Sequence, residues 1–153
     1  FSVEQSFGQL NINSIVQKPS HAEYMALGEG FRGDAEYVIR GFAYSGGGRK
    51  VTRVEVTLDG GRTWELCNVD RPEERYSHTT QYGRYYCACF WSFSTTQARV
   101  LDAAMSVGQL SCRAWDESNN TQPDFLPLSI GDMRNNSHFR VRMRPECLGT
   151  GAA

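Results

Sequence analysis

Residues 39–64 read IRGFAYSGGGRKVTRVEVTLDGGRTW, and this stretch decides the fold that the sequence predicts. In its second half apolar residues alternate with polar ones, which places Val54, Val56 and Leu58 opposite Arg53, Glu55 and Thr57. A period of two is typical of a β-strand that has one face on a core and one face in water. The stretch is therefore expected to form the centre of a β-sandwich.

Two glycine-rich segments border this strand. Asp59-Gly60-Gly61 can reverse the chain, because glycine adopts positive φ without steric cost. The reversal would bring Trp64 and Leu66 back beside the strand. Ser45-Gly46-Gly47-Gly48 is expected to form a second hairpin turn, which ends where the strand begins at Val51.

Further strand patterns follow along the chain. They cover residues 10–16, 36–44, 83–93, 110–116 and 139–143, with Leu10 and Ile12 on the apolar face of the first. Residues 83–93, GRYYCACFWSF, are rich in strand formers and are expected to be a central strand buried on both faces. Residues 100–105 fit either a helix or a strand, and the polar stretches 19–34, 70–82 and 117–124 are expected to be loops. About seven strands with almost no helical period predict an all-β, immunoglobulin-like β-sandwich.

Length, charge and cysteine content limit the function classes. A chain of 153 residues suits one domain, expected at residues 1–144 with a flexible tail at 145–153. The formal charge is −1 and the basic residues are scattered, so no nucleic-acid or membrane partner is expected. Five irregularly spaced cysteines favour reduced thiols in a cytosolic protein, and the close pair Cys87 and Cys89 does not indicate a zinc site. The first residues lack the pattern of a signal peptide and read like a cut made inside a longer protein.

Patterns that indicate catalysis are almost lacking. The histidines at 21, 78 and 138 are scattered, no serine lies in a nucleophile elbow, and no carboxylate pair is marked by its spacing. Residues 28–33, GEGFRG, match the dinucleotide-binding fingerprint, but neither the required strand before them nor the helix after them is predicted. No catalytic residue, metal ligand or cofactor site is therefore assigned, and the residues alone indicate a binding or assembly module.

One short motif is similar to the Asp box of sialidase-type propellers. Thr57-x-Asp59-x-Gly61-x-Thr63-Trp64 matches that hairpin, in which the Asp ties the turn and the Trp packs beneath it. A propeller needs the motif in several blades, whereas this chain has one copy. The resemblance therefore implies a fold element and no catalyst.

A longer resemblance covers most of the chain from Leu10 to Val141. The segments GFAYSGGGRKVTRVEVTLDGGRTW, YGRYYCACFWSF, RAWDESNNTQP and NNSHFRV resemble the C-terminal dimerisation domain of eukaryotic nitrate reductases, in the sulfite oxidase superfamily. The resemblance implies an immunoglobulin-like homodimer within a cytoplasmic enzyme. A molybdenum-molybdopterin domain would precede this chain, and haem and FAD domains would follow it. Such an enzyme reduces nitrate to nitrite with electrons from NAD(P)H, and its molybdenum ligands lie outside this segment.

Two alternatives stay open at this point. The chain could be the dimerisation domain of a sulfite oxidase-like enzyme, or a free-standing β-sandwich that binds carbohydrate or another protein. A molybdopterin domain encoded immediately upstream would favour an enzyme over the free-standing module.

The resemblance also implies two sets of site residues. The resemblance implies a homodimer contact, and the aromatic and basic side chains that are candidates for it are Arg49, Arg53, Trp115, Arg140 and Arg142; each could equally be an ordinary solvated or core-edge side chain. A family segment that reads Trp-Asn-x-Met-Gly-Met-Met and approaches the anion pocket corresponds to residues 128–134, LSIGDMR. The candidates for this active-site-facing loop are Ser129, Gly131, Asp132 and Arg134. The loop departs from the family pattern at Gly131, where Met or Arg is expected, and at Asp132, which replaces a glycine.

Overall fold

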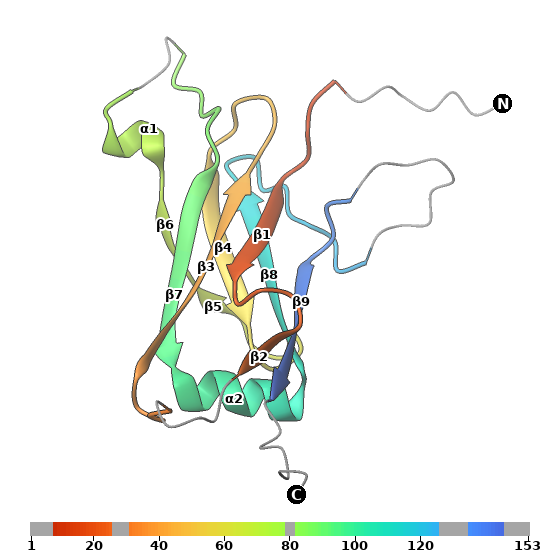
Figure 1. Cartoon of the computed structure of the whole chain (residues 1–153). Helices are drawn as coiled ribbons and strands as arrows, with labels where there is room; N and C mark the ends of the chain where they lie inside the picture. The colour runs from red at the N-terminus through yellow and green to blue at the C-terminus, as the bar shows by residue number, and fades with distance from the viewer. Residues whose placement is uncertain (1–7, 26–30, 79–81, 126–134, 146–153) are drawn as a thin grey trace, which may run out of the picture.

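Two β-sheets pack face to face in the computed structural model, which describes residues 8–25, 31–78, 82–125 and 135–145 (Figure 1). The four-stranded sheet has the order β1 (Asn13–Lys18), β3 (Glu36–Tyr44), β7 (Cys89–Thr96) and β6 (Asn68–Asp70). The five-stranded sheet has the order β2 (Glu23–Met25), β9 (Phe139–Pro145), β8 (Gln109–Asp116), β4 (Val51–Thr57) and β5 (Glu65–Leu66). The all-β, immunoglobulin-like sandwich predicted from the sequence is confirmed, with nine strands in the described part of the chain.

The inward-facing residues of β4 and β8 form the centre of the core. Val54 lies opposite Ala114 and Val56 lies opposite Cys112, and all four residues have an exposed fraction of 0%. Burial of each valine side chain stabilises the fold by roughly 1.5–3 kcal/mol. The alternation in residues 53–58 therefore follows from which side of β4 faces the other sheet.

The Asp59 hairpin forms as predicted. Glu65 and Leu66 pair with β4 in an antiparallel register, and Gly60 and Gly61 have φ values of 77° and 93°. The Asp59 carboxylate accepts hydrogen bonds from the Thr63 hydroxyl at 2.5 Å and from the Thr63 amide at 2.9 Å. These bonds hold the pKa of Asp59 below its usual range. The turn is thus fixed by the short motif that resembles an Asp box.

The prediction of a second hairpin at residues 45–48 is wrong. The segment that follows β3 carries the chain across to β4 in the other sheet, so the two strands are not paired. The turn packs closely against the segment before β1, because a Cβ added to Gly46 would lie 2.3 Å from the carbonyl oxygen of Leu10. A glycine turn reverses the chain but does not determine which sheet receives the next strand, and the pattern alone could not distinguish the two outcomes.

The prediction for residues 83–93 is only partly right. The strand β7 begins at Cys89 and lies inside its sheet, between β3 and β6. Trp91 is 2% exposed, whereas Phe90 is 49% exposed, so the strand has one buried face and one open face. Gly41 leaves room for the Trp91 ring, since a Cβ at this position would lie 2.3 Å from the ring.

Other boundaries differ from the predictions in smaller ways. The first strand starts at Asn13, and Leu10 is 67% exposed, although Ile12 is buried. The segments expected to be loops contain the short strand β2 and the helix α1 (Pro72–Arg75), and β6 ends at Asp70, the first residue of one of these segments. The ambiguous segment belongs to α2 (Gln97–Ser106), which lies across one end of the sandwich (Figure 1). No helix in the described ranges is long and apolar enough to cross a membrane. The predicted tail, apart from Pro145 in β9, lies outside the described residues.

Candidate functional site

Stacked arginine and tryptophan side chains cover part of the outer face of the five-stranded sheet. Arg53 lies 3.9 Å above the Trp115 ring, and Arg113 lies 3.9 Å from the Trp64 ring and 4.7 Å from that of Trp115. Glu55 joins the two cations, because it accepts a 2.8 Å bond from Arg113 and lies 3.3 Å from Arg53. Cation–π contacts of this kind contribute about 0.5–1 kcal/mol each at exposed sites. We call these five side chains the Arg–Trp ladder.

The ladder continues toward the start of β9. The His138 ring contacts the Trp64 ring edge-on at 5.2 Å, and its Nδ1 atom lies 3.2 Å from the Asp124 carboxylate. Arg140 binds the same carboxylate and lies 4.7 Å from the Phe125 ring. Burial lowers the pKa of His138, and the nearby arginines act in the same direction against the opposing effect of Asp124. His138 is therefore neutral at pH 7.

A buried carboxylate ties the crossover segment to the loop after β8. Asp116 is 1% exposed and accepts hydrogen bonds from Arg49 Nε at 2.9 Å and from the Ser45 hydroxyl at 2.8 Å. Its other bonds come from the Ser118 amide at 2.9 Å and from the amide and side chain of Asn120. Burial alone would raise the pKa of Asp116, but these hydrogen bonds outweigh it and lower the pKa. This cluster is a structural clamp.

A second buried polar residue, Gln122, joins four parts of the chain. Its Oε1 atom accepts bonds from the Ser14 hydroxyl at 2.5 Å and from the Ala114 amide at 3.0 Å. Its Nε2 atom donates to Asn13 Oδ1 at 3.1 Å and to the Ser137 carbonyl at 2.9 Å. Gln122 is 2% exposed, so every polar atom of its amide group is satisfied inside the protein.

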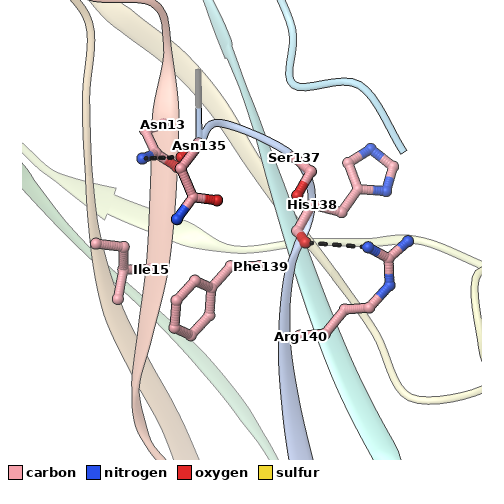
Figure 2. A pocket seen from close by; sticks show the side chains of 7 residues that line it. All are labelled: Asn13, Ile15, Asn135, Ser137, His138, Phe139 and Arg140. Carbon is pink, nitrogen blue, oxygen red and sulfur yellow. Dashed lines mark hydrogen bonds between the residues drawn. The ribbon is translucent and has the colours of Figure 1, made fainter. Parts of the chain in front are cut away.

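A pocket of about 320 Å³ lies between β1 and the start of β9 (Figure 2). Its lining includes Asn13, Ile15, Asn135 and Phe139. Figure 2 shows Asn135 and Phe139 on one side of the β9 ribbon, whereas His138 and Arg140 extend to the other side. Ser137 and His138 also line this pocket, but the His138 ring contacts Trp64 and Asp124, and no hydrogen bond joins the two side chains in the described residues. The pocket is therefore of interest chiefly for its position at the seam between the two sheets.

Comparison with known proteins assigns the domain. The family model for the Mo-co oxidoreductase dimerisation domain matches residues 4–146. The chain belongs to this family. One relative is nitrate reductase [NADH] 1 of Nicotiana tabacum, which is 46% identical over 94% of this chain. Another is nitrate reductase [NADH] 2 of Phaseolus vulgaris, which is 46% identical over 93% of this chain. This dimerisation domain spans 15% of the length of each.

A solved structure supports the fold. The dimerisation domain aligns with the sulfane dehydrogenase SoxCD from Paracoccus pantotrophus with a TM-score of 0.55 and 24% sequence identity. The alignment covers 84% of this chain and 29% of that chain. At this identity the similarity shows the fold alone. The resemblance to the dimerisation domain of nitrate reductases is confirmed by the family match and by the relatives.

The structure brings four of the five predicted interface residues of the dimerisation domain to one sheet. Arg53 and Trp115 belong to the Arg–Trp ladder, and Arg140 and Arg142 lie on the neighbouring strand β9. Arg49 is separate from them, because its guanidinium binds the buried Asp116 at one end of the sandwich. The contribution of all five to a dimer stays a prediction. The loop candidates Ser129, Gly131, Asp132 and Arg134 lie outside the described residues.

Sequence reasoning missed the roles of Asp116 and Gln122. Both occur in RAWDESNNTQP, a segment quoted for the resemblance, but nothing in its pattern shows that their side chains point inward. The described cysteines are free, and burial raises the pKa of Cys89 to about 11 and that of Cys112 to about 12. The described part of the dimerisation domain contains no group of three or more His, Cys, Asp or Glu that could hold a metal ion.

Proposed function

We propose that this chain is the homodimerisation domain of an assimilatory nitrate reductase. The observation that carries the proposal is the 46% identity to NADH nitrate reductases over 94% of the chain. The complete enzyme would be cytoplasmic and would reduce nitrate to nitrite, with electrons passing from NAD(P)H through FAD and haem to molybdenum. The chain spans 15% of the length of that relative, and in this proposal the chemistry would belong to other domains.

The part of this domain in such an enzyme is mechanical. Its described side chains are arranged in a packed core and in two satisfied polar clusters around Asp116 and Gln122, which favour a rigid support over a catalytic centre. Molybdenum-molybdopterin, haem and FAD would be bound by the other domains. The partners of this domain would be a second copy of itself and the molybdopterin domain of its own chain.

The natural protein that contains this chain provides the test. Purified enzyme is expected to oxidise NADH or NADPH when nitrate is added, and to sediment with the mass of a dimer. Sulfite-dependent reduction of an electron acceptor without nitrate reduction would refute the assignment and favour the sulfite oxidase-like alternative. A free-standing polypeptide of this one domain would refute both enzyme assignments.

Charge reversal tests the predicted contact residues within the same assay. Arg140→Glu and Arg142→Glu would change the affinity of the dimer if the outer face of β9 meets a second copy, because each reversal changes the sign of a charge in the contact. An unchanged dimer in both variants would remove these two residues from the interface.

A further inference from the structure

The outer face of the four-stranded sheet carries an apolar row that runs across three strands. Ile15 on β1 lies opposite Phe42 on β3, and Phe42 lies opposite Phe90 on β7. All three point away from the core, because their strand neighbours Ser14, Ala43, Cys89 and Trp91 are buried. Phe90 is 49% exposed, and Ile15 and Phe42 are partly exposed. We call these three residues the apolar row.

A hollow lies next to the apolar row on the same face. It has a volume of about 380 Å³, and its lining includes Val38, Arg40, Asp70, Phe90 and Ser92. Such a hollow can receive a side chain from a second molecule, as pockets at the centre of interfaces do. At its other end the row reaches Ile15, which lines the pocket at the β9 seam together with Phe139. Apolar surface and two recesses are therefore continuous across the sheet.

The size of this face is compatible with a stable contact. The strand β3 has nine residues, so at about 3.3 Å per residue it is roughly 30 Å long. The other three strands, β1, β7 and β6, have six, eight and three residues, so with strands about 4.8 Å apart the four strands together have a projected area of roughly 410 Å². Upright side chains add to this value, and a standard interface buries about 800 Å² per partner.

Charge favours this face over the opposite one for contact between identical copies. In a two-fold dimer, residues near the axis meet their own copies or close neighbours. The four-stranded face carries Arg40 and Arg75 together with Glu36 and Asp70, and Lys18 lies opposite Arg40 on β1, so the formal charge of this face is about +1. The five-stranded face carries five arginines, at positions 53, 113, 140, 142 and 144, and two acids that bind them, Glu55 and Asp124.

The excess of arginine on the five-stranded face makes it self-repelling. Arg142 is exposed, and its guanidinium forms no ion pair with the described residues. A two-fold axis through this face would bring unpaired arginines of both copies together, which costs free energy in a contact that excludes water. The Arg–Trp ladder is also satisfied within its own domain, so its side chains have less to gain from a partner.

On these grounds we infer that a second copy of this chain docks on the outer face of the four-stranded sheet, with the apolar row and its hollow at the centre of the contact. The inference rests on the proposed homodimer and adds which surface forms it. The interface would be isologous, with Phe90 of each copy close to the hollow of the other.

Sedimentation of the natural protein, measured over a wide concentration range, tests this assignment. Phe90→Ala is expected to weaken self-association about 30-fold or more, the loss typical of a central aromatic residue. Arg40→Glu, on an exposed side chain that does not contribute to the core, is expected to weaken it as well without disturbing the fold. Leu66→Glu is the matched control, because Leu66 is 66% exposed on β5 of the other sheet. Arg142→Glu is the second control, and both control variants should remain dimeric.

The outcomes separate this inference from the homodimer proposal. Monomeric unmodified protein would refute the homodimer and this inference together. If the unmodified protein is a dimer and both Phe90→Ala and Arg40→Glu self-associate as tightly as it does, the inference is overturned but the homodimer proposal is not. A changed dimer affinity in Arg142→Glu, stronger or weaker, with unchanged affinity in the other two variants would overturn it in favour of the five-stranded face. The inference would be supported if Phe90→Ala and Arg40→Glu lose the dimer and still unfold cooperatively on heating, while the two control variants remain dimeric.

Discussion

Replacement of Asp116 by alanine is the perturbation with the clearest expected effect on stability. The carboxylate is 1% exposed and binds Arg49, Ser45, Ser118 and Asn120. The Arg49 side chain is itself 18% exposed, so the substitution leaves a largely buried guanidinium without its acid. Removal of one partner from a buried ion pair costs about 3–5 kcal/mol. We expect Asp116→Ala to lower the free energy of unfolding by about this amount.

Urea unfolding of the isolated domain at pH 7 measures the loss. With an m-value of about 2 kcal/mol/M, a loss of about 3–5 kcal/mol moves the midpoint down by roughly 1.5–2.5 M. The matched control is Asp102→Ala on α2, where the aspartate is exposed. A surface change of this kind is expected to stay within about 0.5 kcal/mol.

The same residue predicts an acid dependence whose sign is fixed. The pKa of Asp116 is lower in the folded protein than in the unfolded chain, where it is about 3.9. Its contribution to stability is therefore present above about pH 4 and is lost as the pH falls through the folded pKa. Asp116→Asn removes this part of the acid sensitivity. Two results would contradict the role of the Asp116 clamp. One is a loss of less than about 1 kcal/mol in the free energy of unfolding of Asp116→Ala. The other is a stability of Asp116→Asn that falls below about pH 4 as steeply as that of the parent protein.

Three further predictions concern single positions. Gly41→Ala should destabilise the domain by at least about 1–3 kcal/mol, because the new Cβ would lie 2.3 Å from the Trp91 ring; a thermal melt at or above the parent value would contradict this. The pKa of His138 is lowered in the folded protein, so on acidification the unfolded chain takes up this proton first and the fold loses stability below about pH 6.5. His138→Gln should reduce this loss. The urea midpoints of the parent and the variant, each measured at pH 7 and pH 5, test the prediction. Gln122→Ala leaves the Ala114 amide and the Ser137 carbonyl without partners and should cost about 2–5 kcal/mol, whereas unchanged stability would contradict the structural role of the Gln122 hydrogen bonds.

Regular alternation made much of the fold predictable from the sequence. The pattern in residues 53–58 identified β4 and its buried face, and the pattern in residues 110–116 identified β8. The hairpin after Asp59 was predictable because its turn needs glycine at positive φ, which Gly60 and Gly61 supply. The buried faces of these strands and the turn after Asp59 depend on residues that are close in the sequence, so a local sequence pattern can predict them.

Features that depend on distant residues were not predictable in this way. The crossover after β3 depends on which sheet has room for the next strand, and the open face of β7 depends on what covers Phe90. Arg49 was expected at a surface contact, yet it binds Asp116, 67 residues away in the sequence. The Arg–Trp ladder likewise joins side chains from β4, from β8 and from Trp64 just before β5, and Glu55 and Arg113 are 58 residues apart in the sequence. Such pairs follow from the packing of the sheets.

Hydrogen bonds around Asp124 and Gln122 join the described residues that precede and follow the candidate loop in the sequence. The His138 amide donates to the Pro123 carbonyl at 2.9 Å, and Gln122 binds the Ser137 carbonyl at 2.9 Å. Arg140 adds a bond to the Asp124 carbonyl at 2.9 Å. Three bonds thus join residues 122–124 to residues 137–140, which are described positions close in sequence to the two ends of the candidate loop. If Ser129 and Arg134 act at an anion pocket, as the resemblance implies, Gln122→Ala should change the affinity of the natural enzyme for its anion as well as the stability of this domain. If the affinity for the anion stays constant while the stability falls, the hydrogen bonds of Gln122 support the fold but do not position the anion pocket.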